Sequence, residues 1–284
     1  MADKEIELTK IAEYIYSYLN ISGAGPENSL GANRAVVVGE KFAVAIDSGI
    51  SAKEGKRFIQ DIQKVTQKPV KFLVNTHGHP DHVFGNSEFE KIGAIIVSHE
   101  RSKNMIHKLD VAAEIEKLKD VGMTEEDMEG TVLSSPTLTF DSKMGLDLGN
   151  FTIEILHFGR AHTAGDILIH IPEEKVLFTG DILETDYHPY VGDPEADIDG
   201  WIKVLERMMD LDIERFIPGH GPVSSKEDVA ALIKYLKEFD FNVKKLAAKY
   251  DDVGIISEEL ESLLPARNEM KIVIGGGVIK YLDR

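Results

Sequence analysis

The stretch Asn75-Thr76-His77-Gly78-His79-Pro80-Asp81-His82 decides how this chain is interpreted. Three imidazoles and one carboxylate fall within six consecutive positions, from His77 to His82. The apolar run of residues 70–74 that precedes them is typical of a buried strand. Gly78 and Pro80 disfavour a helix across the motif, so we expect a loop at the end of that strand. Because buried ligand-type side chains each need a polar partner, this loop predicts a metal site.

Three segments further along the chain each place a metal-type ligand beside a predicted strand. His162 lies in a turn between two apolar runs, within residues 160–166. Asp181 ends a predicted strand that begins at Val176. His220 follows another strand and is held in a turn of glycine and proline. With the first loop they make seven candidate ligands: His77, His79, Asp81, His82, His162, Asp181 and His220.

In this order, the motifs resemble the five metal motifs of the metallo-β-lactamase superfamily. The resemblance extends from about Ala35 to Tyr250. It implies an α/β fold, the four-layer αββα sandwich of that family. We expect a single domain over residues 1–284, with a core at about 35–250 and a helical tail at about 251–284.

The resemblance also implies how the ligands are shared. His77, His79 and His162 would hold a first metal, Asp81, His82 and His220 a second, and Asp181 would bridge the two. Three imidazoles with one open position recur in catalytic zinc sites. The second set is harder and also accepts iron or manganese. We therefore expect two divalent metal ions as cofactors, with zinc as the first choice and iron or manganese as alternatives.

Such a site implies a hydrolase that needs no protein nucleophile. A hydroxide bridging the metals would attack an acyl carbon, and Asp81 and Asp181 would be the catalytic carboxylates. The expected substrate is a small acyl compound, namely an ester, a lactone, a thioester or, weakly, a β-lactam. Thr163 and Asp166 are interpreted as turn residues that support the site.

Two alternative activities are kept. An iron-dependent persulfide dioxygenase resembles this fold and shares the first loop, but the full second ligand set argues against it. A true β-lactamase of class B usually has a cysteine where this chain has Asp181. Zinc-dependent members also commonly carry a lysine where this chain has Glu184. A cation from the N-terminal region could replace that lysine, and Arg34 is the nearest candidate.

Residues around the ligands are candidates for contacts with the substrate or support of the metals. Tyr187, His188 and Tyr190 follow the strand of Asp181 and are predicted to border the pocket, with aromatic packing in a surface loop as the alternative. The resemblance implies that Asp47 supports a metal ligand, and the alternative is that it starts a turn.

Composition limits the partners of the chain. The 284 residues include no cysteine, and 43 % are apolar. The formal net charge of −17 disfavours nucleic acid as a partner. No stretch approaches the roughly 20 apolar residues of a membrane span, so we expect no membrane partner. A cytoplasmic location is favoured, and a homodimer is left open.

Five further predictions concern secondary structure. We expect one helix from His99 to about Lys119 and a break at Gly275-Gly276-Gly277. Ser224 and Ser225 begin the longest helix, and each has an acid three residues later (Glu227 and Asp228), which is a capping-box pattern. Residues 11–19 are read as a strand or a short helix, and residues 22–26 as a loop.

Overall fold

In the computed structural model, which describes residues 7–19 and 26–283, the chain forms two β-sheets packed face to face. Within these residues the first sheet has seven strands in chain order. They are β1 (Thr9–Ala12), β2 (Ile15–Tyr18), β3 (Arg34–Val38), β4 (Ala43–Ile46), β5 (Val70–Val74), β6 (Ile95–His99) and β7 (Leu138–Phe140). The second sheet has the order β12-β11-β10-β9-β8. Its strands are β8 (Lys143–Asp147), β9 (Thr152–Leu156), β10 (Leu168–Ile171), β11 (Val176–Glu184) and β12 (Arg215–His220).

Alternating side chains divide the two faces of the first sheet. Val36 and Ala45 pack toward helices, whereas Val37 and Val44 pack toward the second sheet. The second sheet contributes Ile153, Ile155, Ile169, Ile171, Val176, Phe178 and Ile217 to the same core. Strands that are apolar on both faces, such as β3 and β4, belong in a sheet that is covered on both sides.

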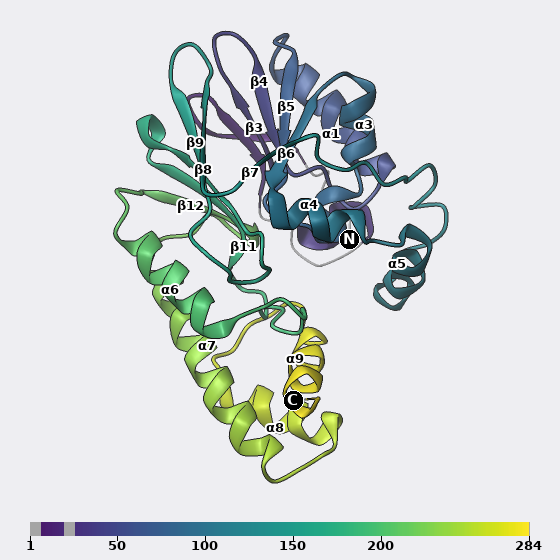
Figure 1. Ribbon diagram of the computed structural model, residues 1–284, viewed down its shortest axis with the longest axis vertical. Helices are drawn as coiled ribbons and strands as arrows, with labels where there is room; N and C mark the ends of the chain where they lie inside the picture. Colours follow the sequence, from purple (N-terminus) through teal and green to yellow (C-terminus); the bar gives the residue numbers. More distant parts are fainter. Residues whose placement is uncertain (1–6, 20–25, 284) are drawn as a thin grey trace.

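Helices cover the outer face of each sheet, so the αββα order of layers predicted from the sequence is confirmed (Figure 1). Phe58 of α1 (Ala52–Val65) and Phe89 of α3 (Asn86–Lys91) pack on the first sheet. Trp201 of α6 (Ile198–Met209) and Leu236 of α7 (Lys226–Ala247) pack on the second. The other helical segments are η1 (Pro26–Gly31), α2 (Pro80–Val83), α4 (Glu100–His107), α5 (Val111–Leu118), η2 (Lys119–Val121), η3 (Pro172–Glu174), α8 (Val253–Leu263) and α9 (Val273–Leu282).

The metal motif is only partly a loop. Residues 75–79 are irregular as predicted, but the short helix α2 begins directly after His79. Pro80 occupies the first position of this helix, where a missing N–H costs no hydrogen bond. The expectation of a loop across the whole motif was therefore wrong for Asp81 and His82, which lie in α2.

Two predicted boundaries also differ. The helix expected from His99 to Lys119 is two helices, because the Asp110 side chain accepts hydrogen bonds from the backbone N–H groups of Ala112 and Ala113 and starts α5 anew. The strand expected to end at Asp181 continues to Glu184, buried along its whole length and paired in parallel with β12. A shift in register around Gly180, whose φ is 50°, lets this strand run on past the site.

The triple glycine does not break the tail, because all three residues lie inside α9. A Cβ on Gly277 would come within 2.6 Å of the Phe239 ring, and one on Gly276 within 3.0 Å of the Tyr190 ring. Glycine here lets α9 approach α7 and the loop after β11 closely. The capping box of Ser225 and Asp228 at α7 is confirmed.

The N-terminal segment adds an edge to the first sheet. Residues 11–19, read as a strand or a helix, contribute to β1 and β2. Most of the loop predicted at residues 22–26 lies outside the described residues. None of the helices in the described ranges is both long enough and apolar enough to cross a membrane.

Candidate metal centre

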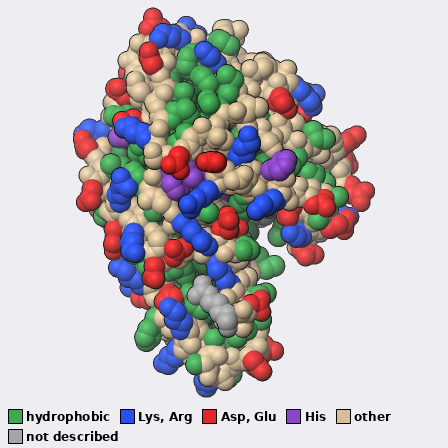
Figure 2. Space-filling view, viewed as in Figure 1, with side chains coloured by type: hydrophobic (Ala, Val, Ile, Leu, Met, Phe, Trp, Pro, Cys, Tyr) green, Lys and Arg blue, Asp and Glu red, His purple; other side chains and the backbone are tan. Residues whose placement is uncertain are grey.

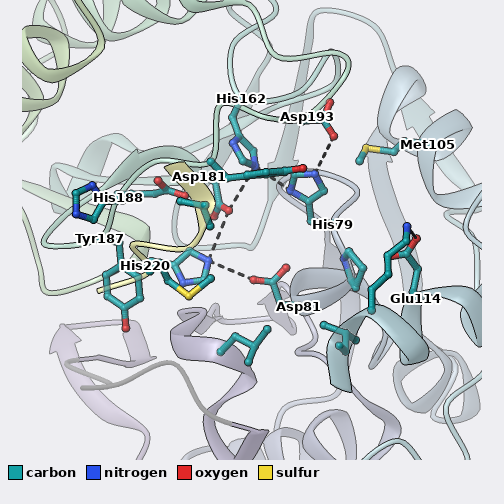
Figure 3. Close-up of a pocket in the computed structure, with 18 of the residues that line it drawn as sticks. His79, Asp81, Met105, Glu114, His162, Asp181, Tyr187, His188, Asp193 and His220 are labelled. Atoms are coloured by element: carbon teal, nitrogen blue, oxygen red, sulfur yellow. Dashed lines mark hydrogen bonds and ion pairs between the residues drawn. The ribbon is translucent and has the colours of Figure 1, made fainter. Parts of the chain in front are cut away.

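The seven candidate ligands come together at the carboxyl-terminal ends of β5 and β12 and beside the middle of β11. Figure 3 shows His79, His162, Asp181, His220 and Asp81 turned toward one space. Among the described residues there are three groups whose ligand atoms lie within 4.8 Å of one another, and the third consists of Asp181, Glu184 and His220. The first is His77, His79, His162 and Asp181, and the second is Asp81, His82 and His220. The structure thus brings together every ligand candidate that the sequence indicated.

In the first group three ring nitrogens face each other. Nδ1 of His79 lies 3.1 Å from Nε2 of His77 and 2.8 Å from Nε2 of His162. A carboxylate oxygen, Oδ2 of Asp181, lies 3.6 Å and 3.5 Å from the same two Nε2 atoms. In a tetrahedral zinc site with Zn–N distances of about 2.0–2.1 Å, neighbouring ligand atoms are about 3.3 Å apart. The spacing of this group therefore fits a metal ion.

The second group is arranged around two carboxylates. Nε2 of His220 lies 3.2 Å from Oδ2 of Asp81, and Nε2 of His82 lies 3.4 Å from the same oxygen. Asp181 faces this group as well, with Oδ1 3.2 Å from His82 Nε2 and Oδ2 3.5 Å from His220 Nε2. One carboxylate thus lies between both sets of imidazoles.

Buried atoms in the middle of the cluster lack ordinary partners. Among the described residues, His82 Nε2 and Asp181 Oδ1 are buried and make no hydrogen bond, although they are ion-pair neighbours. Buried polar atoms of this kind need a compensating ligand. A pair of divalent cations would satisfy both, so the donor set fits the two metal ions expected from the sequence.

Charges within the cluster point the same way. Burial lowers the pKa of His77 well below its usual range and that of His162 to about 3, so both rings are neutral ligands at pH 7. Burial also disfavours charge on His220, but the carboxylates of Asp181 and Asp81 outweigh it and raise its pKa to about 10. The cluster therefore stabilises positive charge on the side of the second group.

Outer contacts fix the orientation of two ligands. Asp47 lies 2.8 Å from His82 Nδ1 and accepts hydrogen bonds from the backbone N–H and the hydroxyl of Thr76. Its backbone has a left-handed φ of 54°, a conformation that costs energy for a non-glycine residue. Of the two roles considered for Asp47, the contacts favour support of a ligand.

Asp193 is a functional candidate that the sequence analysis missed. Its Oδ2 lies 3.0 Å from Nε2 of His79, the ring nitrogen that faces away from the cluster. Such a partner fixes the tautomer of a ligating histidine. Asp193 is not part of a recognisable motif, and its loop comes close to His79 only in the folded chain. The one signal in the sequence is that Asp193 is an acid a few positions after the predicted pocket residues.

A cavity of about 410 Å³ opens next to the ligands. Tyr187, His188 and Tyr190 all line it, together with His79, Asp81, His162, Asp181, Glu184, Asp193 and His220. The Tyr187 ring lies 5.2 Å from that of His220, and the Tyr190 ring 6.0 Å from that of His79. The Nδ1 atom of His188 lies 2.8 Å from the Tyr235 hydroxyl, whereas its buried Nε2 has no hydrogen-bond partner among the described residues. These positions agree with the expectation that the three residues border the pocket.

The lining offers no free cation in the described part of the chain. Lys117 is the lysine of the lining, and it pairs with Glu114 at 2.7 Å. Arg34, considered as a replacement for the lysine of related enzymes, is buried against Glu54 at 2.8 Å and does not line the cavity. Burial and the Asp181 carboxylate raise the pKa of Glu184 well above its usual range. Glu184 therefore repels anions less than its formal charge suggests.

The remaining polar candidates have structural roles. Thr163 donates hydrogen bonds to the Asp166 carboxylate through its backbone N–H and its hydroxyl, closing the turn after His162 as expected. Burial raises the pKa of Asp166 to about 7. The rings of His99 and His157 stack at 4.0 Å outside the cluster.

Comparison with known proteins gives one family match. A family model described as the metallo-beta-lactamase superfamily matches residues 30–220. The chain is 27 % identical over 206 residues to a metallo-beta-lactamase type 2 from Bacillus sp. (strain 170), covering 72 % of this chain and 70 % of that protein. It is 21 % identical over 247 residues to a linear primary-alkylsulfatase from Pseudomonas sp. (strain ATCC 19151).

The extent of these likenesses differs. The match to the alkylsulfatase covers 76 % of this chain but 47 % of that protein, so this chain spans about half its length. Among solved structures, a metallo-beta-lactamase from Pontibacter korlensis matches with a TM-score of 0.65 at 22 % identity, covering 81 % of this chain and 98 % of that one. At this identity the structural likeness concerns the fold.

Proposed function

Since this chain belongs to the metallo-beta-lactamase superfamily, whose members are hydrolytic enzymes, we propose that it is a dinuclear metal-dependent hydrolase of small acyl substrates. One observation carries the proposal: the carboxylate of Asp181 lies between two groups of ligands that converge separately. A single metal bound by the first group would not explain why Asp81, His82 and His220 also converge.

The ligands divide between the two ions as the geometry suggests. His77, His79 and His162 would hold the first, Asp81, His82 and His220 would hold the second, and Asp181 would serve both. When bound, two such ions lower the pKa of a shared water toward neutrality and polarise an acyl carbonyl. The protein orients the ligands through Asp47 and Asp193, which hold the outer nitrogens of His82 and His79.

The substrate lies in the cavity beside the cluster and is held by side chains of the loop after β11. Tyr187, His188 and Tyr190 line this cavity and would contact a substrate bound in it. Uncharged substrates fit best, because the lining has no cation that is free to bind a carboxylate in the described residues. We therefore propose esters, lactones and thioesters ahead of β-lactams.

The alternatives are weaker. A persulfide dioxygenase needs one iron, and the second ligand group argues against it. The similarity to a linear primary-alkylsulfatase makes sulfate esters a second candidate, but their anionic head would depend on the metals alone for a cation. Three points stay predictions from the sequence. They are zinc as the bound metal, with iron or manganese as alternatives, a cytoplasmic location, and the absence of nucleic-acid and membrane partners.

The test is a panel of neutral esters, lactones, thioesters, a persulfide and alkyl sulfates, assayed with protein reconstituted in zinc, iron or manganese. We expect hydrolysis of an acyl substrate that is lost on chelation and returns with metal. Oxidation of the persulfide, or turnover of the sulfates alone, would replace the acyl proposal by the corresponding alternative.

A further inference from the structure

We propose that the C-terminal segment of residues 267–282 forms one wall of the substrate pocket, and that this wall selects substrates with a linear hydrocarbon chain. The inference deepens the proposed function, on which it rests, by naming the substrate class. Met270 and Val273 of this segment line the cavity together with Met105, Leu109 and Leu118, which come from α4, α5 and the turn between them.

The segment is fixed to the loop that carries the pocket residues. Nη1 of Arg267 donates hydrogen bonds to the carbonyl oxygens of Glu184 and Tyr187, at 2.7 Å and 2.8 Å. The backbone N–H of His188 donates to the carbonyl of Glu269 at 3.0 Å. The wall is thus attached to the strand end and the loop that hold Tyr187 and His188.

A second set of contacts fixes the far end of the wall. Nζ of Lys280 donates to the carbonyl oxygens of Asp193 and Ala196, at 2.6 Å and 2.7 Å. Gly276 lies against the ring of Tyr190, where a Cβ would come within 3.0 Å. The space-filling view shows a notch between the lobe of α5 and the lobe of α8 and α9 (Figure 2). This part of the chain lies outside residues 30–220, the range that the family model matches.

The side chains of the two walls suit a flexible apolar chain. Met105 and Met270 both line the cavity, and thioether side chains adapt their shape to an apolar ligand. Met270 keeps a left-handed φ of 59°, a conformation that non-glycine residues rarely adopt. The two charged residues of α5 that line the cavity, Glu114 and Lys117, form an ion pair at 2.7 Å. The pocket therefore combines a metal cluster at one end with apolar walls beside it, as expected for a substrate with a reactive polar head and a hydrocarbon chain.

The experiment measures kcat/KM of the metal-loaded protein for p-nitrophenyl esters from acetyl to octanoyl. We expect a rise of about fourfold for each added methylene while the chain stays in the pocket, the worth of one buried CH₂. Met270→Gln and Val273→Thr keep the size of the side chain and add polarity. In both variants kcat/KM should rise less with each added methylene, because KM falls less as the chain lengthens. Ile272→Thr is the matched control, because Ile272 lies in the same segment but is 67 % exposed and does not line the cavity.

Binding of butanol and octanol to the metal-loaded protein, measured by calorimetry, separates this inference from the proposed function. Octanol should bind more tightly than butanol, and this difference should shrink in both pocket variants but not in the control. Such a result supports the wall even if no ester is hydrolysed. The lack of ester hydrolysis would overturn only the proposed acyl activity. The inference would be overturned if kcat/KM did not rise with chain length and octanol bound no more tightly than butanol. It would also be overturned if Met270→Gln and Val273→Thr left both trends unchanged.

Discussion

Oδ2 of Asp193 lies 3.0 Å from Nε2 of His79, so the opposite nitrogen of the ring, Nδ1, faces His77 and His162. The hydrogen bond places the proton of His79 on Nε2 and leaves the Nδ1 lone pair for a metal. Asp193 belongs to a loop that Lys280 holds in place through backbone carbonyls. A ligand of the first loop is thus oriented by a residue more than a hundred positions later in the chain.

Asp193→Asn should weaken the first metal site without unfolding the protein. The amide loses the charge that favours a proton on Nε2, and such a change typically costs about 10- to 100-fold in metal affinity. Competition with a chromogenic chelator measures this affinity. Glu195→Gln is the matched control, because Glu195 is an exposed acid of the same loop. Equal affinity in all three proteins would show that Asp193 does not orient His79.

Asp181→Ala should abolish turnover while the fold stays largely intact. The carboxylate faces both ligand groups, and its loss leaves two close cations poorly neutralised. The measurement is kcat/KM at saturating metal, with circular dichroism as the check on folding. Asp141→Ala serves as control, because the Asp141 side chain is 91 % exposed. A mutant as active as the wild type would rule out the bridging role.

Substitution of Tyr187, His188 or Tyr190 by alanine should raise KM or lower kcat several-fold for at least one of the three, with metal content unchanged. All three line the cavity, and the buried Nε2 of His188 has no hydrogen-bond partner among the described residues. Tyr235→Phe removes the hydroxyl next to His188 Nδ1 and controls for packing alone. Three alanine variants with wild-type kinetics on the best substrate would assign the residues to aromatic packing.

β-Lactams should be poor substrates, at least about tenfold below neutral esters in kcat/KM, the loss expected when one charge-assisted contact to the drug carboxylate is missing. Lys117 and Arg34 are both paired with acids, so neither is free to bind the drug carboxylate. Burial raises the pKa of Glu184, which weakens its repulsion of that carboxylate. The expected loss therefore comes mainly from the missing cation. The measurement compares penicillin- and carbapenem-type substrates with neutral lactones and thioesters. A preference for the β-lactams by an order of magnitude would contradict this view of the pocket.

The ligands could be predicted from the sequence because their signals are local. His77, His79 and His82 stand in one short motif, and Asp181 and His220 each follow an apolar run beside a glycine. The layer order followed from a resemblance carried by the same motifs. For each of these ligands the pattern predicts a position at the end of a strand. The structure places His77 shortly after β5 and His220 at the end of β12.

The parts that escaped prediction depend on contacts between distant segments. The wall at Met270 and the support by Asp193 arise only where the tail meets the loop after β11. The triple glycine was read as a break because glycine disfavours helices, but close packing against Phe239 and Tyr190 outweighs that propensity. Pro80 likewise disfavours a helix only in its interior, and here it begins one.

The number of metal ions per chain tests the central claim most directly. The Asp181 carboxylate faces both ligand groups, so elemental analysis should find about two divalent ions per chain, either after purification without added metal or after reconstitution with zinc, iron or manganese. The same analysis on His220→Ala should find about one, since that change removes a ligand of the second group alone. A stoichiometry that stays at one in the wild-type protein with every metal would contradict the dinuclear account.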